Sequence, residues 1–336
     1  MRARDMKGRL PWPVAAALVA APLLAVFIAL AVGRIGIAPG DVLQSLATGG
    51  AAGEQTDIVV WTMRLPRILL AALVGAGLSA AGCVFQSLFA NPLATPDTLG
   101  VASGASFGAA LALLLGMGLV GIQAVALVFG GTAVLLTWLA GSGKGRGMNT
   151  IVLAGIMISS LFTALVSLVK FVADTESQLP SITYWLMGSL SSAGFDSLLL
   201  GAPLIIVGIA VLLLLRWRLN ILPLPEDEAR ATGTNVRLLR GITIACATAI
   251  TASCVSMCGQ VGWVGLLIPH ICRMWFGNNH MSLVPVSVSI GAVFMIAVDT
   301  LARSVSAAEI PISVLTAVIG APFFILLMRR TEGWRL

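Results

Sequence analysis

Ten long apolar stretches constrain this 336-residue chain more than any other feature of its sequence. A helix needs about 20 mostly apolar residues to cross a hydrocarbon core of ~30 Å. Charged residues make up 10% of the chain, whereas soluble domains contain roughly 25%. We therefore predict an all-α polytopic membrane protein, with residues 1–336 forming one transmembrane domain. The ten predicted membrane helices lie near 14–33, 65–87, 98–117, 119–140, 149–172, 197–216, 240–258, 261–276, 282–302 and 311–329.

The positions of lysine and arginine predict the orientation of these helices, because cytoplasmic loops retain positive charge. If the N-terminus is cytoplasmic, 15 of the 20 Lys and Arg residues fall on the cytoplasmic side. Ten spans then place both termini in the cytoplasm. The net charge of +6 follows from this arrangement, so no nucleic-acid partner is expected. The basic start resembles a signal peptide, but the long apolar run and the later spans predict an uncleaved first helix.

The sequence contains little that could support catalysis or a bound cofactor. The segment Gly141-Ser142-Gly143-Lys144-Gly145 resembles a phosphate-binding loop, but it lacks the first glycine and the hydroxyl that holds magnesium. Five cysteines fall inside apolar spans and match no zinc or iron–sulfur spacing, so they are expected to be packing residues. We therefore expect no enzyme activity, no metal site and no cofactor bound by this chain.

Ionisable residues are scarce within the predicted spans, and this separates two classes of transporter. A secondary transporter or proton pump needs such groups as relays or coupling sites. Asp299 is the clearest candidate, but Arg303 follows one turn later, so the two are expected to pair. A conduit driven by a separate protein is therefore favoured, and an ATP-independent transporter or channel is the alternative.

One cytoplasmic stretch is unusually polar: eight of the 34 charged residues lie in the 25 positions from Arg216 to Arg240. Pro225 followed by three acidic residues predicts the start of a helix, and Gly233 predicts its end. We predict a short amphipathic helix that contacts a soluble partner. The alternative is an ordinary solvated loop.

Several blocks of the sequence closely resemble the FecCD family, and they follow the family's order from about residue 60 onward. That family supplies permease subunits to importers of iron–siderophores, haem and cobalamin. The blocks are Arg64-Leu65-Pro66-Arg67, Gly75 through Gly82, Gln86, Asn91-Pro92-Leu93-Ala94, Leu99 through Ala105, Glu226 through Gly233, Gly262 through Arg273, Asp299 through Arg303, Glu309-Ile310-Pro311 and Gly320 through Phe323.

The resemblance implies a permease subunit that passes a metal chelate from a periplasmic binding protein to the cytoplasm, across a bacterial inner membrane. It further implies a second permease copy, or alternatively a paralogue, and two cytoplasmic ATPase subunits that bind the ATP and magnesium. Iron bound to a siderophore is the first-choice substrate. Haem, cobalamin and an oxyanion such as molybdate remain open.

The resemblance also implies roles for three groups of residues. A coupling loop at about 217–239 docks on the ATPase through Glu226, Asp227, Glu228, Ala229, Arg230, Ala231, Thr232 and Gly233. On the outer side, acidic side chains of the binding protein meet Arg64, Arg67 and Arg303, unless these arginines only anchor helix ends. The cytoplasmic gate falls at Asn91, Leu93 and Thr150.

Small residues and prolines predict how the helices pack and end. Gly100, Gly104 and Gly108 are expected to let a neighbouring helix approach closely. The Asn91-Pro92 step is expected to end the second span. A weak similarity between the helices that lead to Gln86 and Gln260, which run in opposite directions, suggests an inverted repeat of spans two to five and seven to ten.

Overall fold

The ten predicted spans each correspond to one helix in the computed structural model, which describes residues 10–51, 55–141, 143, 148–306 and 309–330. The described residues form helices and connecting loops without a strand, so the all-α prediction is confirmed. Seven of the ten helices are long enough to cross a membrane, and α5, α12 and α14 are shorter. The ten are α1 Trp12–Ala31, α4 Leu65–Leu88, α5 Val101–Leu114, α6 Leu119–Gly141, α7 Met148–Val172, α9 Phe195–Leu215, α11 Val236–Cys258, α12 Val264–Phe276, α13 His280–Val305 and α14 Ile312–Arg330.

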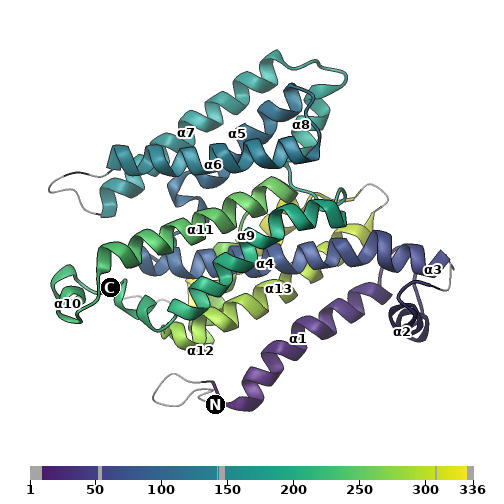
Figure 1. Ribbon diagram of the computed structural model, residues 1–336, viewed down its shortest axis with the longest axis horizontal. Helices are drawn as coiled ribbons and strands as arrows, with labels where there is room; N and C mark the ends of the chain where they lie inside the picture. The colour runs from purple at the N-terminus through teal and green to yellow at the C-terminus, as the bar shows by residue number, and fades with distance from the viewer. Residues whose placement is uncertain (1–9, 52–54, 142, 144–147, 307–308, 331–336) are drawn as a thin grey trace.

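Short helices lie at the two ends of this bundle (Figure 1). Helices α2, α3 and α8 lie at one end, and the predicted amphipathic helix α10 lies at the other. Of these short helices only α10 was predicted from the sequence. The others contain too few apolar residues to be recognised as spans. The short elements are α2 Pro39–Thr48, α3 Gln55–Asp57, the π-helix η1 Ile58–Arg64, the 3₁₀ helix η2 Pro96–Leu99, α8 Gln178–Leu186, the 3₁₀ helix η3 Arg218–Ile221 and α10 Glu226–Ala231.

Helix α4 is the centre of the molecule. It packs against α9, α11, α12 and α13, and 20 of its 24 residues are buried. Helices α5 to α8 form a layer on one side, whereas α1 lies along the opposite side (Figure 1). Only two of the 20 residues of α1 are buried, so this helix is attached at the edge of the bundle.

Glycines allow α4 to contact its neighbours backbone to backbone. A Cβ atom at Gly75 would overlap the carbonyl oxygen of Gly291 on α13, and one at Gly82 would overlap the carbonyl oxygen of Gly265 on α12. Pro269 lacks the amide that would bond the Gly265 carbonyl within α12, yet it does not break the helix. The close approach of Gly82 therefore packs α4 against a carbonyl that lacks its usual helical partner.

The three glycines at four-residue spacing have two different roles. Cβ atoms at Gly104 and Gly108 would lie 2.5 Å from the carbonyl oxygens of Phe129 and Val125 on α6, so the packing prediction is confirmed for these two. Gly100 instead precedes α5 with a φ of +78°, a left-handed conformation that other residues adopt only with strain. Its role is to turn the chain into the helix.

Helices α5 and α12 share a geometry that fits the expected inverted repeat. Each is short and follows a non-helical entry, with a positive φ at Gly100 before α5 and at Trp263 before α12. Helix α5 follows α4 in the first predicted repeat, and α12 follows α11 in the second. Helices α4 and α11 run in opposite directions (Figure 1). Paired short helices in corresponding halves are typical of inverted-repeat transporters.

The close contact at Gly82 leads to a stability prediction. Gly82→Ala should lower the free energy of unfolding by about 1–3 kcal/mol, because added volume in a packed core forces the backbones apart. Gly241→Ala is the matched control, since a Cβ atom at this exposed position in α11 meets open space. It should be neutral or stabilising by about 0.4–1 kcal/mol. Thermal unfolding in detergent measures both, and equal melting temperatures would contradict the packing argument.

Candidate functional site

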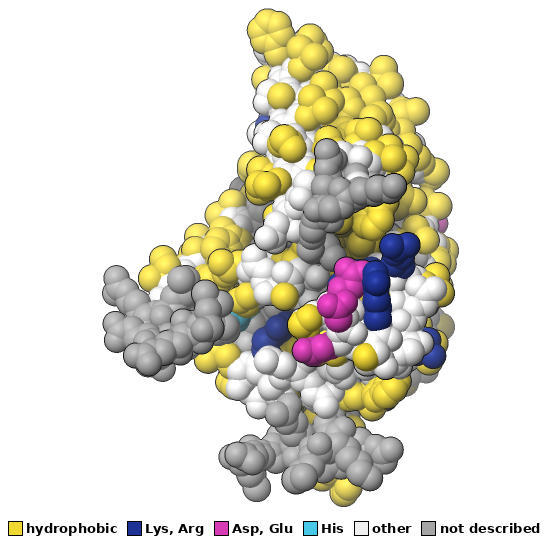
Figure 2. Space-filling model, turned by 90° about the vertical axis from the view of Figure 1, so that its left-hand side faces the viewer, with side chains coloured by type: hydrophobic (Ala, Val, Ile, Leu, Met, Phe, Trp, Pro, Cys, Tyr) yellow, Lys and Arg dark blue, Asp and Glu magenta, His cyan; other side chains and the backbone are white. Residues whose placement is uncertain are grey.

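The acidic residues of α10 project from one end of the molecule (Figure 2). Glu226, Asp227 and Glu228 occupy the first turn of this helix, and Arg230 pairs with Glu226 on its exposed surface. Ala229 is fully buried among Ile221, Leu224 and Val236, which fixes the helix to the adjoining segments. Pro225 is the N-cap residue, and Gly233 has a φ of +73° just beyond the C-terminus. The predicted start and end of this helix are therefore confirmed.

A small cavity brings the predicted gate loop and coupling loop together. It has a volume of about 230 Å³, and its walls include Asn91 and Pro92 from the loop after α4 and Pro223 from the segment before α10. Arg273 also lines it and donates a hydrogen bond to Oε1 of Gln86 at 3.2 Å. The two loops are about 130 residues apart in sequence, yet they line one cavity at the α10 end.

A hydrogen-bond chain next to this cavity joins three elements. Asn220 of η3 accepts through Oδ1 from both the backbone amide and Nδ1 of His280, at 2.9 and 3.0 Å. Because an amide oxygen can only accept, Nδ1 carries the proton and Nε2 of the neutral ring accepts from Ser87 Oγ, 2.6 Å away. Ser87 and His280 are each 2% exposed. The chain therefore connects η3, the first residue of α13 and the last turn of α4.

This row of serine, histidine and asparagine was not predicted from the sequence. Its members are separated by 60 and 193 residues, so no local pattern marks them. Similar rows orient nucleophiles in some enzymes. Here each member comes from a different helical element, and the chain of bonds holds those elements together.

The predicted gate residues lie on two neighbouring elements. The backbone amide of Leu93 donates a hydrogen bond to Oδ1 of Asn91, at 2.9 Å. Leu93 itself is 54% exposed. Thr150 lies in the first turn of α7. Helix α7 crosses η2 closely, since a Cβ atom at Gly155 would overlap the Thr98 carbonyl. The structure thus places Thr150 on the helix that crosses η2, the element that follows the gate loop, and its role in gating stays a prediction.

A polar groove of about 710 Å³ runs along one exposed side of α7. Its walls come from η2, the start of α5, the exposed side of α7 and the loop before α12. Serine and threonine hydroxyls dominate, with one carboxyl group and one amide, and no Lys or Arg is among the described lining residues. The lining residues are Thr95, Asp97, Thr98, Ser103, Ile156, Ser159, Ser160, Thr163, Ala164, Ser167 and Gln260.

Three of the four α7 hydroxyls that line the groove are already hydrogen-bonded within the helix. Ser160 donates to the Ile156 carbonyl at 2.9 Å and Ser167 to the Thr163 carbonyl at 3.1 Å. Burial raises the pKa of the Asp97 carboxyl to about 6, although the amides of Ala102 and Ser103 donate to it. The groove is therefore polar, but most of the hydroxyls that α7 presents to it already have a partner within the helix.

The three predicted docking arginines meet at the opposite end of the bundle. Their exposed fractions are only 6% for Arg64, 8% for Arg67 and 7% for Arg303. Arg67 pairs with Asp299 through Nε and with Glu309 through Nη1, each at 2.8 Å. The expected i, i+4 pair is present but looser, with Arg303 Nε at 3.7 Å from Asp299 Oδ2.

The remaining contacts of this arginine cluster hold the end of α1. Arg64 donates to the carbonyls of Leu30 and Ile35, and Arg303 donates to the carbonyl of Ala29. Both guanidinium groups close around Gly33, where a Cβ atom would lie 2.7 Å from Arg64 Nη2 and 2.8 Å from Arg303 Nη1. All three arginines thus have partners within the chain, which fits the alternative that they anchor helix ends. They outnumber the two carboxylates, and docking of a binding protein stays a prediction.

Metal ligands do not gather in the described part of the chain. No three of its His, Cys, Asp and Glu side chains lie close enough together to hold an ion. Cys83, Cys254, Cys258 and Cys272 are buried free thiols inside the bundle. Of the segment that resembles a phosphate-binding loop, residues 142, 144 and 145 lie outside the described residues.

The bundle, with seven described helices long and apolar enough to cross a membrane, is that of a multi-pass membrane protein. The FecCD transport family model matches residues 20–330, and the chain therefore belongs to the FecCD transport family. It is an ABC transporter permease. The fold and the family resemblance predicted from the sequence are both confirmed.

Individual relatives show how this family varies. The chain is 42% identical to the molybdate import system permease protein MolB of Haemophilus influenzae, over 91% of its length and 92% of the relative's. It is 38% identical to a probable iron chelatin permease of Helicobacter pylori, over 82% and 84% of the two chains. A solved inward-facing metal-chelate type ABC transporter is similar over 95% of this chain and 100% of that chain, with 39% identity and a TM-score of 0.86.

The buried ion pairs lead to a second stability prediction. Arg67→Ala should destabilise the protein by about 3–5 kcal/mol, because the buried carboxyl group of Asp299 would lose its main partner. Arg230→Ala is the matched control: it breaks the exposed pair with Glu226 and should change stability by less than about 1 kcal/mol. Thermal unfolding compares the two. Adding Asp299→Asn to Arg67→Ala should restore part of the loss, and equal melting of the two single variants would contradict the prediction.

Proposed function

We propose that this chain is the permease subunit of an ATP-driven importer of a metal chelate, with iron bound to a siderophore as the first-choice substrate. Two copies form the conduit in a bacterial inner membrane, with both termini in the cytoplasm. A periplasmic binding protein delivers the chelate. Two cytoplasmic ATPase subunits bind the ATP and magnesium, and this chain holds neither.

The polar groove on α7 is the observation that carries this proposal. A row of hydroxyls with Asp97 and Gln260 is unfavourable against lipid, so it requires water or another protein surface. A second permease copy facing α7 would enclose the groove and convert it into a channel. Because Ser160 and Ser167 are bonded within α7, such a channel would bind its cargo weakly and release it readily.

ATP-driven movement needs a connection between the docking helix and the gate. The acidic turn of α10 offers a surface to an ATPase, and η3 precedes it in the same coupling loop. From η3 the bonds of Asn220 and His280 lead to Ser87, four residues before Asn91. We expect displacement of the coupling loop to reach the gate by this route. At the other end, the excess positive charge of the arginine cluster suits an acidic binding protein.

Molybdate is the second candidate substrate. The 42% identity to a molybdate permease over 91% of the chain favours it. Against it, the described groove lining has a carboxyl group and no basic residue, a poor environment for a dianion. A metal chelate spreads its charge over a larger molecule and fits this lining better.

Transport in proteoliposomes tests the proposal. With binding protein and ATPase present, the permease should take up iron–siderophore when ATP is supplied, and permease alone should take up none. Reversing Glu226, Asp227 and Glu228 to Lys should release the ATPase and abolish uptake, because the partner would meet repulsive charge. Uptake driven by a proton or sodium gradient without ATP would overturn the importer class. ATP-driven uptake of molybdate instead of iron–siderophore would change only the substrate.

The control for the charge reversal uses the opposite end of the molecule. Asp174 and Glu176 are exposed acidic residues in the loop between α7 and α8, so changing both to Lys should leave the ATPase bound. Normal insertion and melting of the α10 variant shows that the fold is intact. If the ATPase still co-purifies with that variant at the wild-type yield, α10 is not its docking surface.

The hydrogen-bond chain generates a separate prediction about coupling. Asn220→Ala should lower the number of substrate molecules moved per ATP hydrolysed by several-fold, because it disconnects η3 from His280. Asn278→Ala is the matched control, since Asn278 lines the cavity beside Ser87 and His280 but has no place in the hydrogen-bond chain. Uptake and ATP hydrolysis measured together give the ratio. A purely structural role for Asn220 would lower the melting temperature and leave this ratio unchanged, which would contradict the proposed connection.

A further inference from the structure

A second, larger groove lies between α1 and the body of the bundle. Its volume is about 1020 Å³, and its walls come from α1, α4, α9 and α13. Alanines keep it open on several sides, among them Ala15, Ala72, Ala202 and Ala292. Helix α1 buries only two of its residues, so this side of the bundle is only loosely covered.

Almost all of the lining is apolar. Leu18 and Val19 of α1 face it together with Ile206 of α9 and Val288 of α13. The hydroxyl of Ser289 also lines it, but that group donates to the Leu18 carbonyl at 2.6 Å and so ties α13 to α1. A water-filled groove with these walls would be unfavourable, so its occupant is apolar along most of its length.

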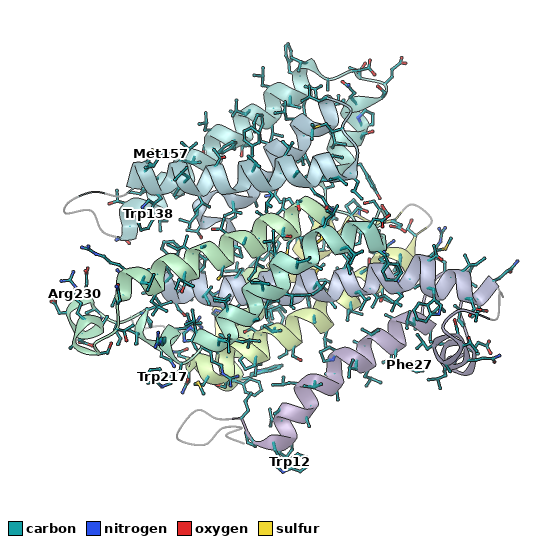
Figure 3. The ribbon with its side chains drawn as sticks, in the orientation of Figure 1. Trp12, Phe27, Trp138, Met157, Trp217 and Arg230 are labelled. Atoms are coloured by element: carbon teal, nitrogen blue, oxygen red, sulfur yellow. The ribbon has the colours of Figure 1, made fainter. Side chains whose placement is uncertain are left out.

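One end of the groove carries a charge. Arg216, just after α9, lines it near Leu10 and Met281, at the end of the molecule where α10 lies. No described carboxylate forms an ion pair with Arg216. Trp217 follows it and is 66% exposed, and tryptophan is enriched where membrane lipid meets water (Figure 3). The charged end of the groove therefore lies at the depth of the lipid headgroups.

The groove is long enough for the acyl chain of one lipid leaflet. At a rise of 1.5 Å per residue its lining spans roughly 16.5 Å on α13, from Met281 to Ala292, and roughly 27 Å on α9, from Leu198 to Arg216. Half of a hydrocarbon core of ~30 Å is about 15 Å. An acyl chain that starts beside Arg216 would therefore run along the groove to the middle of the membrane.

We propose that this groove binds a phospholipid with a net negative charge, its acyl chain between α1 and the bundle and its phosphate on Arg216. The basic end and the apolar length are complementary to this one molecule. A second protein copy would have to insert an apolar segment and an acidic group together, which a lipid supplies without rearrangement. The lipid fills the space that α1 leaves open and so holds α1 against the bundle. This inference depends on the membrane location and is independent of the proposed substrate and partners.

Native mass spectrometry of the purified protein tests the site, with phosphatidylglycerol and zwitterionic phosphatidylcholine supplied in equal amounts. The wild type should retain phosphatidylglycerol in preference by about fivefold, the effect of one basic side chain near an anionic lipid. Arg216→Ala should remove the preference, and Arg216→Lys should keep it. The matched control is Arg218→Ala, because Arg218 is the next basic residue but does not line the groove.

A groove-filling variant tests the position of the acyl chain. Ala15→Phe changes an exposed residue of α1 that lines the groove, so it fills the space without disturbing the core. It should reduce retention of both lipids. Free inorganic phosphate should not displace phosphatidylglycerol if the acyl chain contributes. Equal lipid retention by the wild type, Arg216→Ala and Arg218→Ala, unchanged retention by Ala15→Phe, or displacement by phosphate would each overturn the proposal.

Discussion

The bundle depends on the backbone contacts that α4 makes with α12 and α13. Lipid is as apolar as the side chains it surrounds, so it does not drive helices together as water does, and close packing must distinguish one arrangement from another. At Gly75 and Gly82 the absence of a Cβ atom allows α4 to reach the carbonyls of Gly291 and Gly265. These contacts make α4, α12 and α13 one tightly packed unit, and the other helices are arranged around it.

Polar bonds join both ends of the α4 and α13 pair. At one end Arg67 of α4 pairs with Asp299 of α13, and at the other end Ser87 of α4 bonds His280 of α13. Two helices that are packed in the middle and bonded at both ends resist movement relative to each other. The same polar bonds connect this rigid pair to α1 at the arginine end and to the coupling loop at the α10 end. The two ends of the membrane protein are thus mechanically connected through its most buried part.

Helices α5 to α8 form a layer apart from this rigid pair, and the layer carries the polar groove (Figure 1). Gly100 turns the chain into α5, Gly155 allows α7 to cross η2, and the layer packs against α11, where Gly130 of α6 lies close to Ala252. Hydroxyls that bond their own helix keep α7 regular while they present polar atoms to the groove. Helix α7 therefore presents a polar surface without losing the regular backbone hydrogen bonds of a helix.

The ten helices and the short helix α10 could be predicted from local residues, because membrane thickness sets the length of apolar runs and proline and glycine mark helix ends. The sequence also indicated which arginines reach one end of the bundle. Only the tertiary structure showed that Arg64, Arg67 and Arg303 have partners within the chain, since those partners lie between 4 and 274 residues away. The chain of Ser87, Asn220 and His280 and the polar groove were hidden for the same reason. Local composition decides which segments enter the membrane, whereas side-chain partners depend on helix packing that no local pattern records.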